Sequence, residues 1–292
     1  MEKLIIEAAI NEGQMKATNP NVPYSPEEVA RDAEACVKAG ASIIHFHDRD
    51  AKTGETRWNN PATYSESMRL VRKRTDAICY PTYHSMLPRE ERFKHFFAMA
   101  DDPTVRLELT TVDAGAVLMG RYDPKAKSIS NPERVSANTH ADVLYLLQES
   151  KKRKLKVVFG IREPGGLRHI EAYCSMGLLD APVLLKFFLV EDVSYGLPYE
   201  ARSLQLYADL VPKSIPVVWF VQGYGSRHFA LNTASIAMGG HARTGLGDLA
   251  VLDGKKPTNA DLVARIAEVS RSLGRDVATP KEAREILGLA KR

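Results

Sequence analysis

The sequence contains few cysteines and no long hydrophobic run. Cys36, Cys79 and Cys174 are scattered among 292 residues without a CxxC pair, so we expect small buried side chains and no disulfide framework. No stretch approaches the roughly 18 apolar residues that cross a bilayer. The apolar start turns polar where a signal peptide would continue its apolar run. These features predict a cytoplasmic protein with no membrane partner.

Neither sign of charge dominates the sequence. The 40 Lys and Arg residues against 36 Asp and Glu leave a net charge of +4. Nucleic-acid-binding proteins concentrate Lys and Arg on one face. The one dense basic run, 151–156, falls where a predicted helix ends, a position that suits cations because of the helix dipole. No nucleic-acid partner is expected.

Short apolar runs alternate with helical patterns along the whole chain. The predicted strands are 4–9, 42–46, 77–80, 105–109, 156–161, 183–190, 216–222 and 240–244, and the predicted helices are 25–40, 61–74, 89–100, 141–154, 167–176, 200–210, 227–238, 260–273 and 280–287. Strands that are apolar on both faces and separated by helices indicate a parallel sheet covered by helices. Eight such units predict a single (β/α)8 TIM barrel over 1–292, with a C-terminal helical extension. A doubly wound open sheet is the alternative, but no GxGxxG turn follows the first strand.

A histidine pair marks the end of the second predicted strand. Residues two apart on a strand point to the same side, so His45 and His47 are expected to face together into the barrel mouth. Two neutral imidazoles on one face are a metal-ligand pair, most plausibly for Zn²⁺. The alternative is a hydrogen-bonded histidine pair in a polar pocket.

The eighth predicted strand ends in an arginine and is followed by an aspartate. Arg243 lies at the strand end, where a guanidinium can clamp a carboxylate with two parallel hydrogen bonds. Asp248 could act as a base or hold Arg243 in place. A structural ion pair between the two is equally consistent with the sequence.

Further polar or flexible positions follow other predicted strands. Gly223 and Gly225 lie directly before a helix, where barrels often bind phosphate after strands seven and eight, although a tight turn would also require them. Thr82 after the third strand, and Glu108 and Thr110 at the fourth, are predicted to bind substrate.

The chain resembles the β-keto acid cleavage enzyme family over nearly its full length. The blocks that carry the resemblance appear in the family's order: EAAIN at 7–11, NPNVPYSPEEVA at 19–30, AGASIIHFHDRD at 39–50, GGHARTGLGD at 239–248, and the C-terminal block 257–289.

The resemblance implies a homotetrameric Zn²⁺-dependent barrel. Its reaction converts a β-keto acid and acetyl-CoA into acetoacetate and the CoA ester of the remaining fragment. His45 and His47 match the family's metal histidines, Arg243 matches its catalytic arginine, and Asp248 matches the neighbouring aspartate. The glycine-rich segments after strands seven and eight are expected to admit the pantetheine arm of CoA.

The sequence departs from the family at the third zinc ligand. The family has a glutamate immediately before the aspartate, and this chain has Gly247. The family also has a glutamate after the first strand. Residues 12–14 of this chain occupy that region, and the sequence does not fix which of them corresponds to it. The third ligand therefore stays open between Glu7, Glu108, Glu163, a substrate oxygen and water, and the chain belongs to a divergent branch.

Two other functions fit the same residues. One is a metal-dependent aldolase, lyase or hydrolase on the same barrel that does not use CoA. The other is a non-catalytic barrel that binds a small acid, which the loss of a ligand at Gly247 would favour.

Overall fold

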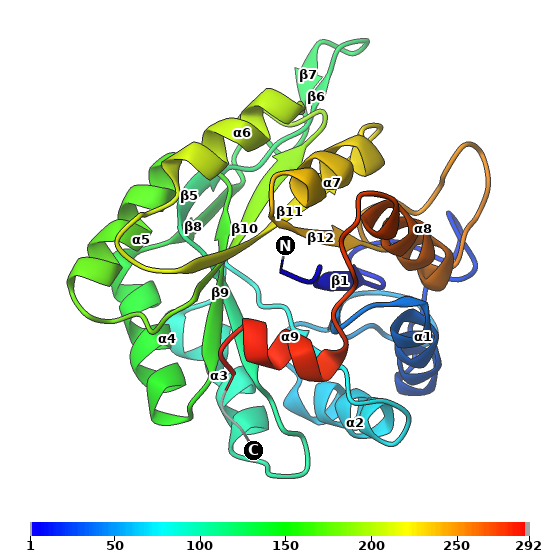
Figure 1. Ribbon diagram of the computed structural model, residues 1–292, viewed down its shortest axis with the longest axis horizontal. Helices are drawn as coiled ribbons and strands as arrows, with labels where there is room; N and C mark the ends of the chain where they lie inside the picture. The colour runs from blue at the N-terminus through cyan, green and yellow to red at the C-terminus, as the bar shows by residue number, and fades with distance from the viewer. Residues whose placement is uncertain (1, 290–292) are drawn as a thin grey trace.

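Eight parallel strands form the centre of the protein in a computed structural model that describes residues 2–289. They are β1 (Ile6–Ala9), β2 (Ile43–Phe46), β3 (Ile78–Pro81), β4 (Leu109–Asp113), β9 (Lys156–Ile161), β10 (Val183–Val190), β11 (Val217–Tyr224) and β12 (His241–Thr244). The sheet order is β3-β2-β1-β12-β11-β10-β9-β4. Because β3 and β4 lie side by side, the sheet curls into a TIM barrel (Figure 1).

Helices cover the outside of this barrel, as the alternating pattern predicts, and the last of them lies across the end at which the strands begin (Figure 1). They are α1 (Pro26–Ala39), α2 (Pro61–Arg72), α3 (Arg89–Ala100), α4 (His140–Lys152), α5 (Gly165–Ser175), α6 (Ala201–Leu210), α7 (His228–Ala237), α8 (Asn259–Ser272) and α9 (Pro280–Ile286). Four of them begin with a reciprocal capping box, as at Ser25 and Glu28 of α1, which satisfies backbone N–H groups at the start of the helix. None of the helices described within 2–289 is long and apolar enough to span a membrane.

The fourth barrel strand lies four residues later than predicted. The apolar run 105–109 predicted it, but the strand is Leu109–Asp113. Val105 and Leu107 are fully buried, and Arg106 between them has a φ of 56°, which no regular strand contains. Residues 105–108 of the apolar run therefore belong to a buried loop before the strand. As a result, residue 109, predicted as the last residue of this strand, is its first.

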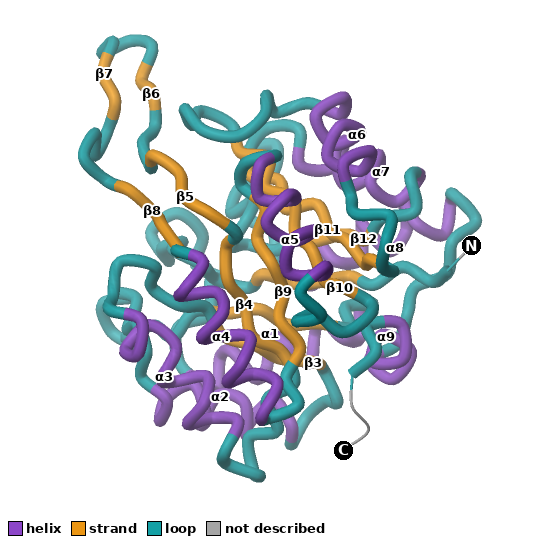
Figure 2. Tube along the Cα trace, turned by 90° about the vertical axis from the view of Figure 1, so that its left-hand side faces the viewer, coloured by secondary structure: helices purple, strands orange, loops and turns teal. Residues whose placement is uncertain are grey.

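A two-stranded arm leaves the barrel between β4 and α4. It consists of the antiparallel pairs β5 (Gly115–Leu118) with β8 (Val135–Asn138) and β6 (Tyr122–Asp123) with β7 (Ser128–Ile129). Figure 2 shows the arm projecting beyond the helices. The sequence indicated only a long connection here.

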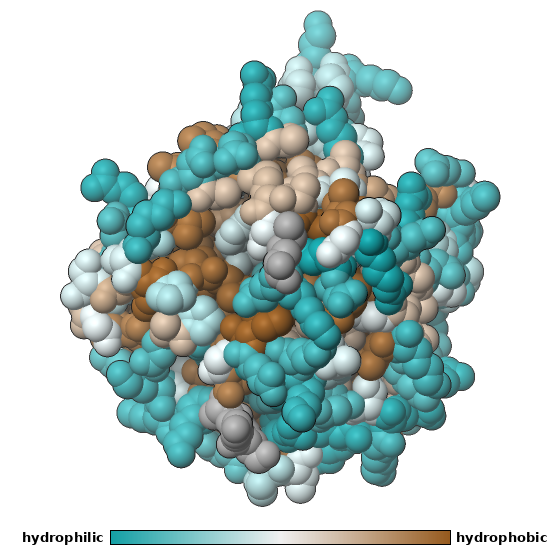
Figure 3. Space-filling view, viewed as in Figure 1, coloured by the Kyte–Doolittle hydropathy of each residue, from teal (hydrophilic) through white to brown (hydrophobic). Residues whose placement is uncertain are grey.

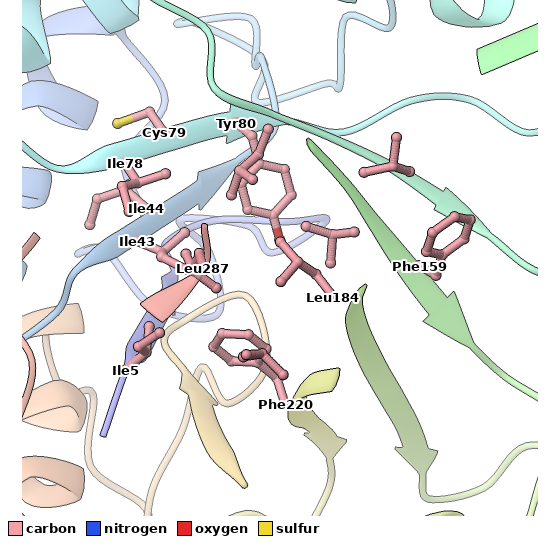
Figure 4. Packing of buried hydrophobic residues seen from close by; sticks show 14 of the residues in the cluster. Ile5, Ile43, Ile44, Ile78, Cys79, Tyr80, Phe159, Leu184, Phe220 and Leu287 are labelled. Atoms are coloured by element: carbon pink, nitrogen blue, oxygen red, sulfur yellow. The ribbon is translucent and has the colours of Figure 1, made fainter. Parts of the chain in front are cut away.

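The barrel interior is apolar at one end and charged toward the other. Tyr80, Leu184 and Phe220 point into the interior (Figure 4), and two residues further along β10 the inward side chain is Lys186. On the face that carries α9, hydrophilic side chains dominate the periphery and hydrophobic patches lie nearer the centre (Figure 3). Along β10, the inward side chains therefore change from apolar to charged toward the carboxyl end of the strand.

Candidate active site

A cavity of about 160 Å³ opens at the carboxyl ends of the barrel strands. This is the end at which barrel enzymes carry their active sites. Its lining includes side chains from or just after β1, β2, β10 and β12, namely Glu12, His45, His47, Lys186 and Arg243.

Three potential metal ligands converge in this cavity. The imidazole Nε2 of His45 lies 3.3 Å from Glu12 Oε1, and that of His47 lies 2.9 Å from Glu12 Oε2. One donor atom from each residue falls within 4.8 Å of the other two. Two imidazoles and a carboxylate are a typical protein donor set for a divalent transition metal.

The tautomer of His45 places an unprotonated ring nitrogen opposite Glu12. Its Nδ1 lies 3.2 Å from the carbonyl oxygen of Tyr80, and because a carbonyl only accepts, Nδ1 carries the proton. Burial lowers the pKa of His45 to about 4, so the ring is neutral at pH 7 and its Nε2 has no proton. A lone pair therefore points at a carboxylate oxygen, an arrangement that a bound cation stabilises.

Gly247 leaves the space that the Glu12 side chain fills. A Cβ atom at residue 247 would lie 2.4 Å from Glu12 Cγ and 2.9 Å from the carbonyl oxygen of Ala9. Glu12 itself has a φ of 44°, in the left-handed region where a side chain strains the backbone. The residues present thus fit a metal ion, with Glu12 supplying the carboxylate.

The other carboxylates considered as third ligands lie elsewhere. Glu7 lies deeper in the barrel, where Tyr80 and Lys186 donate to it. Glu108 lies at the amino end of β4 and accepts two hydrogen bonds from Arg284. Glu163 accepts the backbone N–H of residue 196.

Arg243 lies at the centre of a buried ion network. Its guanidinium donates to Asp248, with N···O distances of 2.9 to 3.3 Å, and to Glu7 at 2.9 Å. It also donates to Glu12 and to the hydroxyl of Tyr224. Arg243 and Asp248 are therefore an ion pair, and Arg243 is fully buried.

Comparison with known sequences identifies the kind of enzyme that carries this site. A profile of the family described as beta-keto acid cleavage enzyme matches residues 3–289. The chain belongs to the β-keto acid cleavage enzyme family.

Relatives of this cleavage enzyme match it along its length. The 3-keto-5-aminohexanoate cleavage enzyme of Fusobacterium nucleatum subsp. nucleatum is 30% identical over 295 residues and covers all of both chains. The 3-oxoadipate:acetyl-CoA acetyltransferase of Cupriavidus necator is 27% identical over 277 residues, which are 94% of this chain and 90% of that protein.

A solved structure confirms the barrel. Apo ObcA superposes with a TM-score of 0.72 at 15% sequence identity, and the match covers 93% of this chain. The chain spans 66% of ObcA, so that protein is longer. The likeness at this identity supports the fold of the cleavage enzyme.

Lys186 is a charged residue of the cavity that the sequence analysis missed. Its ammonium lies 3.2 Å from Glu7 Oε1 and contacts the Tyr80 hydroxyl, and burial lowers its pKa. Burial alone would raise the pKa of Glu7, but Lys186 and Arg243 outweigh it and lower that pKa to about 2. A single lysine inside the apolar run VLLKFFLV was the signal, because such a position is buried on a barrel strand.

The predicted substrate-binding residues divide into those at the cavity and those away from it. Thr82 lines the cavity. Thr110 instead faces the outside of β4, where its hydroxyl lies 3.3 Å from that of Ser150 in α4. Together with Glu108, it was misplaced because the strand was predicted four residues early. Thr111 and Asp113 take the cavity positions on β4.

The predicted anion site before α7 is already filled by the protein itself. Glu191 accepts the backbone N–H of Ser226 at 2.6 Å and its hydroxyl at 2.7 Å. A Cβ at Gly225 would lie 2.4 Å from the same carboxylate. Gly223 packs near Leu231 and Tyr199. These glycines belong to a tight turn that Glu191 closes.

Proposed function

We propose that this protein is a zinc-dependent enzyme that converts a β-keto acid and acetyl-CoA into acetoacetate and a new CoA ester. In this exchange the bond between the keto carbon and the CH2–COO⁻ unit breaks, and the acetyl group of acetyl-CoA takes its place on that unit. The acyl fragment that is released bonds to the CoA sulfur.

The observation that carries the proposal is the convergence of Glu12, His45 and His47 beside Arg243 in one cavity. Bound there, Zn²⁺ would act as a Lewis acid that polarises a carbonyl oxygen. Glu12 is suited to the ligand role because His47 and Arg243 outweigh its burial and hold its pKa well below the usual value.

The cations of the cavity suit an anionic substrate. The ion network of the cavity contains three carboxylates, Glu7, Glu12 and Asp248, and two cations, Lys186 and Arg243. Its net charge is therefore −1, and a bound divalent ion would change it to +1. Arg243 is held on several sides by protein groups. We therefore assign it a fixed positive charge that stabilises the negative charge developing during cleavage, with Asp248 holding its orientation.

The test is a mass-spectrometric assay of the zinc-loaded enzyme with acetyl-CoA and a panel of β-keto acids. The wild type is expected to form acetoacetate and a CoA ester that matches one of the acids. His45→Ala should lose both the metal and the turnover. Equal metal content and equal turnover in the two proteins would contradict the proposal.

A metal-dependent aldolase or hydrolase without CoA is the second candidate, because the same three ligands would serve it. Acetyl-CoA should raise the melting temperature of the enzyme if it binds the folded state. No shift at saturating acetyl-CoA, together with cleavage of a keto acid in its absence, would favour the second candidate.

We also propose, from the family resemblance, that the enzyme acts in the cytoplasm as a homotetramer. Light scattering on the purified protein tests the assembly, and a mass of four chains is expected.

A further inference from the structure

A second cavity of about 280 Å³ lies beneath the arm and adjoins the cavity that contains Glu12, His45 and His47, which we call the metal cavity. The arm forms one wall and the loop after β10 forms another, and a bridge between Arg121 and Val193 joins them. Arg134, Arg162 and Phe188 line both cavities. A molecule in the second cavity would therefore reach the metal cavity directly.

The second cavity is strongly basic. Arg121, Arg134 and Arg162 line it, and no Asp or Glu among residues 2–289 does. The charge of Arg162 is offset by Asp113, whose Oδ2 lies 2.8 Å from its Nε. Arg121 and Arg134 form no ion pair with any residue in 2–289, so two uncompensated cations face this space.

The rest of the lining suits a long and partly apolar ligand. Met119, Val190 and Val193 supply apolar surface, and Ser130 and Tyr195 supply hydroxyl groups. Two adjoining cavities, one with uncompensated cations of the arm and one with the candidate metal ligands, match a ligand that carries phosphates at one end and a reactive group at the other.

We propose that this second cavity binds the phosphate-bearing end of the CoA thioester, with Arg121 and Arg134 contacting its phosphates. This inference rests on the proposed function. It places CoA between the arm and β10 and away from the glycines after β11, whose anion site Glu191 fills. The arm of this chain is thus a cofactor-recognition element, shown projecting in Figure 2.

The test compares acetyl-CoA with acetyl-pantetheine, a thioester that lacks phosphates. For the double variant Arg121→Ala/Arg134→Ala we expect KM for acetyl-CoA to rise about 10- to 100-fold, because two charge-assisted contacts are lost. The single variant Arg121→Ala should leave KM for the keto acid and KM for acetyl-pantetheine at the wild-type value, because Arg121 lines only the second cavity. Lys125→Ala is the matched control, since Lys125 is an exposed cation of the same arm outside the cavity, and it should change none of these values.

Two results would overturn the assignment. One is a wild-type KM for acetyl-CoA in the double variant. The other is a selective rise in KM for keto acids that carry a second carboxylate, which would mean that the arginines bind the keto acid.

A calorimetric titration with free CoA separates failure of this assignment from failure of the proposed function. If the wild type turns over no β-keto acid, the proposed function is wrong, and the titration still decides the cavity. Binding of CoA that the double variant loses supports the assignment. Equal binding by both proteins, or none by either, contradicts it.

Discussion

At the scale of single residues, the site depends on a pairing between Glu12 and Gly247. The strained backbone of Glu12 brings its carboxylate between two imidazoles, and the absence of a side chain at Gly247 leaves room for it. From sequence, Gly247 indicated only a lost ligand. The sequence alone does not show that Glu12 occupies the space beside Gly247, because the two residues come together only when the barrel closes.

Gly247→Ala is therefore expected to displace Glu12. The added methyl would overlap Glu12 Cγ at 2.4 Å, and we expect zinc affinity to fall about 10-fold or more, as losses of ligand support commonly do. Metal content after dialysis against a zinc buffer measures it.

Gly13→Ala is the matched control for this prediction. A Cβ at Gly13 meets no atom within 4 Å, so zinc affinity should be unchanged. Retention of wild-type affinity by Gly247→Ala would show that Glu12 is not a ligand.

At the scale of elements, the strands and helices were largely predictable, and the error in β4 shows why some were not. Strands were predicted from runs of apolar residues, and a buried loop such as 105–108 contains apolar residues as well. In the arm, β6 and β7 were not predictable because they are two-residue exposed strands without an apolar run. The apolar sequence GAVL of β5 was the one available signal. The site residues on β2 and β12 were predictable, since polar side chains at the carboxyl end of an apolar barrel strand face the region where barrels hold their active sites.

The corrected position of β4 gives Glu108 a structural role in joining α9 to the barrel. Glu108 is 3% exposed and accepts two hydrogen bonds, of 2.7 and 2.9 Å, from Arg284 of α9. Arg284→Met would leave this buried carboxylate with Arg72, whose Nη2 lies 3.7 Å from Glu108 Oε2, and without either of its two hydrogen bonds from Arg284. We expect the unfolding free energy to fall by about 3 kcal/mol. Urea unfolding measures the loss.

The comparison variant is Lys3→Met, which removes an exposed ion pair with Glu282 of the same helix. Its urea midpoint should stay near the wild-type value. If Arg284→Met has a similarly small effect, Glu108 does not depend on α9.

At the scale of the whole molecule, buried neutral histidines make the barrel sensitive to acid. Burial lowers the pKa of His95 to about 4 and that of His241 to about 3, with Arg275 adding to the effect at His241. Because the unfolded chain binds protons at these histidines below about pH 6.5 and the folded chain does not, their contribution to stability is complete above that pH. It is lost as the pH falls toward the folded pKa.

His95→Gln is expected to flatten this dependence. A glutamine does not titrate and can donate to the Thr82 carbonyl that His95 contacts at 2.7 Å. Between about pH 7 and pH 5 the variant should lose about 2 kcal/mol less unfolding free energy than the wild type. Parallel urea titrations at the two pH values measure the difference, and identical losses would mean that His95 is not neutral in the folded protein.

We propose that this barrel exchanges acyl groups between a β-keto acid and acetyl-CoA, and acetyl-CoA labelled with ¹³C at both acetyl carbons tests this exchange directly. We expect acetoacetate that carries both labels in its acetyl half, and an unlabelled new CoA ester. Unlabelled acetoacetate, or cleavage of the keto acid without any new CoA ester, would contradict it.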